Sequence, residues 1–272
     1  MTFYSLLTSI QQKTNSLLCI GLDTDAKKIP VHLRSKKNII LEFNKQIIGA
    51  TKDLACAYKI NFAFYEGLGK EGWSIIERTR ALIPSSVLTI ADAKRGDIGN
   101  SSGYYANAIL RELDFDSITV APYMGKDSVQ PFLQDEKKGV FLLALTSNEG
   151  AFDFQYKKVG GRRLFEEVVV TSQQWTTRDN LGFVVGATKS KDIQSVRKLA
   201  PTAPFLVPGI GAQGGSIDDV IKYGCTPDGY GVVINASRSI LYASSRKDFA
   251  DATRNEAMKL RDEINSIQKK YY

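Results

Sequence analysis

The chain has 272 residues, of which 43% are hydrophobic and 24% are charged. This composition is ordinary for a globular protein and excludes a wholly disordered or fibrous chain. The length fits one large α/β barrel or two modest domains. The net charge of +7 comes from basic residues scattered among acidic ones. That pattern is typical of solvated helix faces, so we expect no nucleic-acid partner, whereas a small anionic ligand is compatible with it.

Two features of the sequence predict the location of the protein. No segment approaches the roughly 18 consecutive apolar residues that a membrane-spanning helix requires. Near the N-terminus, Gln11, Gln12 and Lys13 lie where a signal peptide would carry its apolar stretch. We therefore expect a cytoplasmic protein that does not associate with membranes.

Cysteine and histidine are rare in this chain. The three cysteines are far apart and each lies in or beside an apolar run, which predicts buried, reduced thiols: Cys19, Cys56 and Cys225. The only histidine, His32, follows Pro30 in a polar stretch and is expected at the surface. A single histidine leaves no His-rich or Cys/His metal cluster, so we expect no metal site.

Short apolar runs of the kind that form buried parallel strands recur along the chain. There are eight, at residues 16–22, 54–60, 87–91, 117–121, 140–145, 182–186, 204–207 and 231–234. Helical patterns separate them; Ile39, Phe43 and Ile47, for example, share one helix face. The charged segment 244–272 has spaced apolar positions and is predicted to be a closing helix.

Eight buried strands that alternate with helices in about 250 residues are expected of a (β/α)8 TIM barrel. No Pro/Gly/Ser-rich linker divides the chain, so we predict one α/β barrel domain over residues 1–272. The main rival is a doubly wound open sheet, which usually has a G-x-G-x-x-G motif after its first strand. Residues 21–25 read GLDTD instead. The sequence therefore favours the barrel.

In such a barrel the active site lies at the carboxyl ends of the strands. Polar or charged residues, and one proline, end or follow several predicted strands: Asp23, Lys59, Asn61, Asp92, Lys94, Asp97, Pro208, Asn235, Ser237 and Arg238. Each alone is also explained as a helix cap. Lys59 and Lys94 are harder to explain in this way because each follows a strongly apolar run. Regular strand alternation directs Asp92 and Lys94 to the same side, so lysines and aspartates are predicted to converge, each favouring the charged form of the other.

A second candidate site lies at the end of the barrel. Residues 208–215 read PGIGAQGG after the seventh predicted strand, and residues 235–238 read NASR after the eighth. Barrels often bind phosphate with these two loops, where backbone N–H groups meet the anion. Arg238 would add a bidentate contact. We therefore predict a phosphate-binding site here.

The motifs resemble those of a known family. Residues 90–99 read IADAKRGDIG and contain D-x-K-x-x-D-I, and residues 58–61 read YKIN. From Cys19 to about Arg238 the chain resembles the orotidine 5'-phosphate decarboxylase family, in its longer-chain branch. The resemblance implies decarboxylation of orotidine 5'-phosphate to UMP, the last step of de novo pyrimidine nucleotide synthesis. It also implies no cofactor and a homodimer with shared active sites.

The resemblance also implies roles for individual residues. The charged catalytic tetrad is Lys59, Asp92, Lys94 and Asp97, and the segment with Asp97, Ile98 and Ser101 reaches the partner's site. Asp23 binds the ribose, Thr146 and Ser147 lie by the pyrimidine, and Gln213 and Arg238 hold the phosphate. Asn61, Pro208, Asn235 and Ser237 complete the predicted substrate site. Two positions depart from the family pattern, which often has threonine at Ser101 and glycine at Ser237.

Two alternatives stay open at this point. A magnesium-dependent sugar-phosphate decarboxylase or lyase of the same suprafamily shares the D-x-K-x-x-D motif, but has a carboxylate at the position of Lys59. A barrel without catalytic activity that binds anionic ligands would also fit the basic charge.

Overall fold

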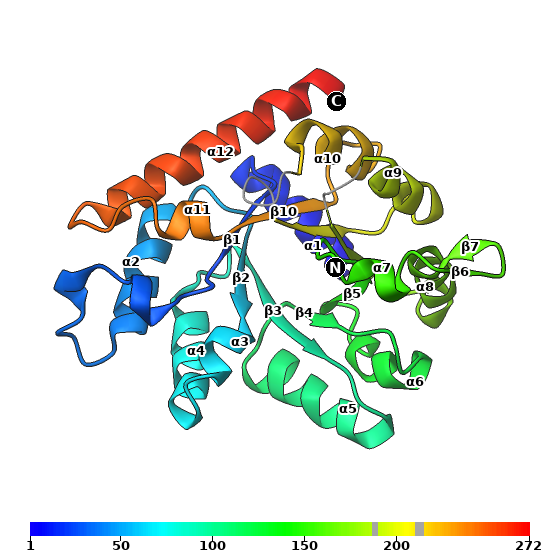
Figure 1. The fold of residues 1–272 in the computed structure, drawn as a ribbon, viewed down its shortest axis with the longest axis horizontal. Coiled ribbons are helices and arrows are strands. Elements are labelled where there is room, and N and C mark those ends of the chain that lie inside the picture. The colour runs from blue at the N-terminus through cyan, green and yellow to red at the C-terminus, as the bar shows by residue number, and fades with distance from the viewer. Residues whose placement is uncertain (187–189, 210–214) are drawn as a thin grey trace.

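The computed structural model describes residues 1–186, 190–209 and 215–272. Eight parallel strands close into a barrel in the order β1-β10-β9-β8-β5-β4-β3-β2. Figure 1 shows this ring of strands at the centre, with the helices arranged around it. The predicted (β/α)8 TIM barrel is confirmed.

Each of the eight predicted apolar runs overlaps one barrel strand. The strands are β1 (Leu18–Gly21), β2 (Ala57–Asn61), β3 (Leu88–Arg95), β4 (Ser117–Val120), β5 (Gly139–Leu145), β8 (Leu181–Val185), β9 (Phe205–Pro208) and β10 (Val232–Ala236). β3 extends past the predicted end at residue 91 and β10 past residue 234, so Asp92, Lys94 and Asn235 lie on strands rather than after them. A short hairpin, β6 (Lys158–Val159) and β7 (Arg162–Arg163), was not predicted.

Helices follow the strands around the barrel. They are α1 (Phe3–Thr14), α2 (Ile39–Thr51), α3 (Phe62–Glu66), α4 (Lys70–Leu82), α5 (Gly99–Ala106), α6 (Lys126–Val129), α7 (Ala151–Phe154), α8 (Leu164–Ser172), α9 (Ser190–Leu199), α10 (Ile217–Gly224), α11 (Arg238–Leu241) and α12 (Phe249–Tyr271). Shorter turns are η1 (Ala26–Lys28), η2 (Val31–Leu33), the π-helical η3 (Asn107–Glu112), η4 (Gln130–Leu133) and η5 (Gln173–Trp175). The predicted closing helix is α12, which begins at Phe249 rather than at residue 244.

Helix α1, which was not predicted, closes the amino-terminal end of the barrel. Its Phe3 ring packs edge-on against Phe141 of β5, with ring centroids 5.8 Å apart. Gly139 must lack a side chain, because a β-carbon there would lie 2.4 Å from the Phe3 ring. Gln11 donates to the carbonyl of Val232 at 2.7 Å. With this end filled, the carboxyl ends of the strands form the open mouth of the barrel.

The predictions for the cysteines and the histidine agree with the structure. All three cysteines are free and buried, and burial raises the pKa of Cys56 to about 12. His32 is exposed and its ring lies 5.8 Å from that of Phe249. None of the helices in the described ranges is long and apolar enough to cross a membrane.

Candidate active site

A buried lysine links two aspartates at the barrel mouth. Lys59 of β2 is 4% exposed, and its Nζ lies 3.0 Å from Asp92 Oδ2 and 3.3 Å from Asp23 Oδ1. Lys59 lies on β2 and Asp92 on β3, while Asp23 lies two residues after the end of β1. These three strands are neighbours in the barrel. Burial alone would lower the pKa of Lys59, but the carboxylates of Asp92 and Asp23 outweigh burial and raise it. Lys59 is therefore a fixed cation.

Asp92 also contacts the second lysine. Lys94 Nζ lies 2.6 Å from Asp92 Oδ1, and the Lys94 side chain is 51% exposed toward solvent. Burial would raise the pKa of Asp92, but the charges of Lys59 and Lys94 outweigh it and lower this pKa to about 2. One carboxylate therefore separates two ammonium groups, with one oxygen facing each.

Asp92 and Lys94 contact each other, as the sequence predicts, but they lie in a bulge and not in a regularly paired strand. The pairing of β3 with β4 passes from Ala91↔Ile118 to Arg95↔Val120, so three residues of β3 lie opposite one residue of β4. Lys94 has a φ of +47°, which residues with a β-carbon rarely adopt. The backbone at Lys94 is therefore strained, a condition typical of functional sites.

The lowered pKa of Asp92 predicts a pH-dependent contribution to stability. A carboxyl whose pKa falls from 3.8 to about 2 on folding stabilises the fold above its unfolded pKa, and this contribution disappears as the pH falls toward the folded pKa. Between about pH 5 and about pH 2.5, the difference in unfolding free energy between wild type and Asp92→Asn should shrink by about 1.5 kcal/mol. Urea unfolding at both pH values measures this difference, and a constant difference would contradict the prediction.

A pocket of about 180 Å³ opens beside this charged array. Its lining runs from the ion pairs to the ends of β9 and β10: Asp23, Lys59, Asn61, Asp92, Pro208, Gly209, Asn235, Ala236, Ser237, Arg238 and Ser239. Gly209 has a φ of +83°, which favours glycine where the loop leaves β9. Gln213 lies outside the described residues. The pocket thus joins Lys59 and Asp92 to the predicted phosphate-binding loops, while Lys94 contacts Asp92 at its edge.

Strand β1 and the loop after β10 approach each other closely at Gly21. A β-carbon at Gly21 would lie 2.0 Å from the Ser237 Oγ, so only glycine allows β1 and the loop after β10 to meet in this way. Ser237 has a φ of −124°. This conformation does not require glycine, so serine fits at a position where the family often has glycine.

Two predicted residues have structural contacts of their own. The Asn61 side chain accepts a hydrogen bond from Ala63 N at 3.2 Å and so caps α3. Thr146 lines a different cavity, an apolar one of about 630 Å³ beside β5 and α8. There Gln155 accepts from Thr146 N and donates to Thr146 Oγ1, both at 2.8 Å. Ser147 follows directly, and its backbone packs against Gly186 at the end of β8.

The segment after β3 lies apart from the charged pocket in this chain. Asp97 Oδ1 accepts a hydrogen bond from Ile98 N at 2.7 Å, and Asp97 does not line the pocket. Ile98 is 65% exposed, and Ser101, on α5, is also exposed. A single chain therefore brings together Lys59, Asp92 and Lys94, but not the fourth residue of the predicted tetrad.

Thr119 of β4 was not predicted to belong to the site. Its Oγ1 donates to Asp92 Oδ1 at 3.0 Å and accepts from Lys94 N at 2.9 Å. The available signal was modest: Ser117 and Thr119 alternate with Ile118 and Val120, so the two hydroxyls share one face of the strand.

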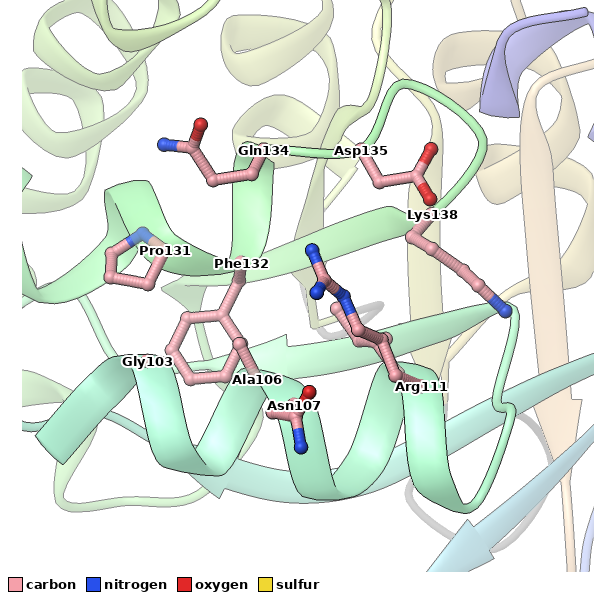
Figure 2. A pocket seen from close by; sticks show the side chains of 10 residues that line it. Gly103, Ala106, Asn107, Arg111, Pro131, Phe132, Gln134, Asp135 and Lys138 are labelled. Atoms are coloured by element: carbon pink, nitrogen blue, oxygen red, sulfur yellow. The ribbon is translucent and has the colours of Figure 1, made fainter. Parts of the chain in front are cut away.

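A third cavity, of about 290 Å³, lies between α5, η3 and η4. Figure 2 shows Arg111 reaching from the helix toward the segment with Gln134 and Asp135. Lys138, which also lines it, directly precedes β5, so this cavity is at the end of the barrel opposite the mouth. Within the described part of the chain, no group of three or more His, Cys, Asp or Glu side chains is arranged to hold a metal ion.

Comparison with known proteins agrees with this geometry. The model of the Orotidine 5'-phosphate decarboxylase / HUMPS family matches residues 16–252. Orotidine 5'-phosphate decarboxylase of Flavobacterium johnsoniae is 51% identical over 270 residues, which cover 98% of both chains. The enzyme of the same name from Dehalococcoides mccartyi is 48% identical over 100% of both chains.

A solved structure extends the comparison to the fold. The structure of Leishmania donovani OMP decarboxylase superposes with a TM-score of 0.87 at 38% sequence identity, covering 99% of this chain and 100% of that one. The similarity is therefore found in sequence and in fold, over almost the whole chain. The chain belongs to the orotidine 5'-phosphate decarboxylase / HUMPS family.

Proposed function

We propose that this protein is a decarboxylase that converts orotidine 5'-phosphate to UMP and CO2, the last step of de novo pyrimidine nucleotide synthesis. The observation that carries the proposal is the array in which Asp92 separates Lys59 and Lys94 at the mouth of the barrel. Membership of the family supports the same reaction.

The chemistry demands a strong electrostatic site. When the bond from C6 to the carboxylate breaks, CO2 leaves and the electron pair stays on C6 in the plane of the ring, where the carbonyl groups cannot delocalise it. Enzymes lower such barriers by up to about 23 kcal/mol, which requires charges that are in place before the reaction. Lys94 supplies the cation beside C6 and then transfers an Nζ proton to C6 to give UMP. Solvent returns the proton to Lys94, so no cofactor is needed.

The neighbouring charges hold Lys94 in place for this step. Asp92 accepts a hydrogen bond from Lys94 Nζ and faces the departing carboxylate, while the charge of Lys59 keeps Asp92 ionised. Asp23 and Lys59 hold the ribose hydroxyls of the substrate, and Asn61 lines the same pocket. Thr146 and Ser147, which follow β5, lie by the pyrimidine.

The phosphate group binds at the ends of β9 and β10 in this proposal. Arg238 lines that part of the pocket, and loss of a charged hydrogen-bonding partner should raise KM roughly 10- to 100-fold in Arg238→Ala. Substrate without its phosphate should lose most of its kcat/KM, because binding energy at the phosphate lowers the barrier at C6. Steady-state kinetics measure both effects, with Arg111→Ala, at the far cavity, as the matched control. Near wild-type values in both assays would contradict this assignment.

The protein is also proposed to act as a homodimer with shared sites. Apolar side chains at least 40% exposed cluster in the segments after the neighbouring strands β3 and β4, and after β5: Ile98, Tyr104, Tyr105, Tyr123, Met124 and Phe154. A second copy of the chain would cover them. It would also receive Asp97, Ile98 and Ser101, which lie away from the pocket of their own chain.

The alternative within the suprafamily requires magnesium. Lys59 occupies the position where that alternative needs a carboxylate, and a buried ammonium 3.0 Å from Asp92 would repel a metal ion there. Full activity in EDTA is therefore expected. Loss of activity that magnesium restores would favour the sugar-phosphate enzyme instead.

The direct test is incubation with orotidine 5'-phosphate while the ultraviolet absorbance of the pyrimidine is followed. Conversion to UMP is expected, and its absence with correctly folded protein would favour a barrel that only binds anions. The cytoplasmic location, the absence of nucleic-acid and membrane partners and the single domain over residues 1–272 stay predictions of the sequence.

A further inference from the structure

The hydroxyl of Thr119 connects two residues of the charged array. Thr119 is 1% exposed, and its Oγ1 donates to Asp92 Oδ1 at 3.0 Å and accepts from the backbone N–H of Lys94 at 2.9 Å. A hydroxyl has a single proton to donate. One buried atom therefore fixes both the carboxylate of Asp92 and the backbone of Lys94.

The position of Thr119 matches the irregular part of β3. It is the β4 residue that lies opposite the three-residue bulge at 92–94. A bulge removes residues from regular strand pairing, and Lys94 has in addition a positive φ of +47°. A conformation of this kind persists only where the surroundings hold it. The hydrogen bond from Lys94 N to Thr119 replaces the strand pairing that the bulge removes.

Thr119 also sets how the carboxylate of Asp92 is turned. Oδ1 accepts from Thr119 and, at 2.6 Å, from Lys94 Nζ, while Oδ2 accepts from Lys59 at 3.0 Å. Without the hydroxyl, Oδ1 of Asp92 would keep only the contact from Lys94, whose side chain is half exposed.

We propose that Thr119 is a positioning residue that holds the Lys94 ammonium beside C6 of the substrate. It does so by fixing Asp92 and the strained backbone of Lys94, without contacting the substrate. This inference rests on the proposed decarboxylase activity.

The test compares a replacement that removes the hydroxyl with one that keeps it. Thr119→Val keeps the branched shape and removes the hydroxyl, so kcat should fall roughly 10- to 100-fold because misplaced groups lose rate steeply. KM should change by less than about threefold, since ground-state contacts are kept. Exchange of the C6 proton of UMP with D2O should slow by the same factor as kcat. Thr119→Ser keeps the hydroxyl and should remain within about threefold of wild type in all three measurements.

Thr89→Val is the matched control. The Thr89 hydroxyl, 1% exposed, also donates to a carboxylate, Asp116 Oδ2 at 2.7 Å, and accepts from a backbone N–H, that of Asp116 at 3.0 Å. It lies at the amino end of β3, away from the mouth. Thr89→Val should lower the melting temperature about as much as Thr119→Val while leaving kcat unchanged.

The outcomes separate this inference from the proposed function. Wild type that does not convert orotidine 5'-phosphate would overturn the proposed function. If wild type is active, two outcomes would overturn the inference alone. One is a Thr119→Val enzyme that keeps its kcat, and the other is a Thr119→Ser enzyme as slow as Thr119→Val. If Thr119→Val does not fold, Thr119→Ala is measured under the same criteria.

Discussion

Replacing Lys94 with methionine is expected to lower kcat by roughly 10⁴-fold or more, since it removes both the cation beside C6 and the proton donor. Methionine keeps an unbranched stem of similar length. The ammonium of Lys94 is half exposed and directed to Asp92 at 2.6 Å, so the fold does not depend on it. The absorbance assay with orotidine 5'-phosphate, at high enzyme concentration, measures the residual rate.

The affinity for UMP must be measured together with kcat. The affinity of Lys94→Met for UMP should remain within about tenfold of wild type, because the phosphate and ribose contacts are kept. Lys70→Met, an exposed lysine at the start of α4, is the matched control and should have wild-type kcat. A Lys94→Met enzyme within about tenfold of the wild-type kcat would show that another group protonates C6.

The pattern of apolar residues along the chain predicted the barrel well because its strands are buried. Strands buried on both faces are continuous apolar runs, and each predicted run overlaps a barrel strand, with ends displaced by a few residues. Helix α1 was not predicted. Phe3, Leu7 and Ile10 have helical spacing, but only the tertiary structure shows that they fill the amino-terminal end of the barrel.

The candidate site was predictable in composition but not in geometry. Residue type and position in the sequence identified Lys59, Asp92 and Lys94, because a lysine after a strongly apolar run is not explained as a helix cap. The bulge and the positive φ of Lys94 depend on pairing with β4, which is distant in sequence. The role of Thr119 follows from the same pairing, so alternation within β4 alone could not reveal it.

The predicted role of Asp97 involves two chains, because this residue is expected to act in the active site of the partner. Its carboxylate accepts from Ile98 N at the start of α5 and lies outside the pocket that holds Lys59 and Asp92. If it acts in the partner's site, Lys94→Ala and Asp97→Ala abolish the activity of each homodimer for different reasons. A mixed dimer then has one site that lacks both groups and one site with both intact.

Mixing the two inactive variants is therefore expected to restore activity. Random exchange makes about half of the dimers mixed, and each has one intact site of two, so about a quarter of the wild-type activity should return. Recovery should follow the rate of subunit exchange, which tagged chains report independently. Mixing Lys94→Ala with Asp92→Ala is the control: Asp92 and Lys94 contact each other within one chain, so no mixed site regains both. Complete exchange without recovery of activity would place Asp97 outside the partner's site.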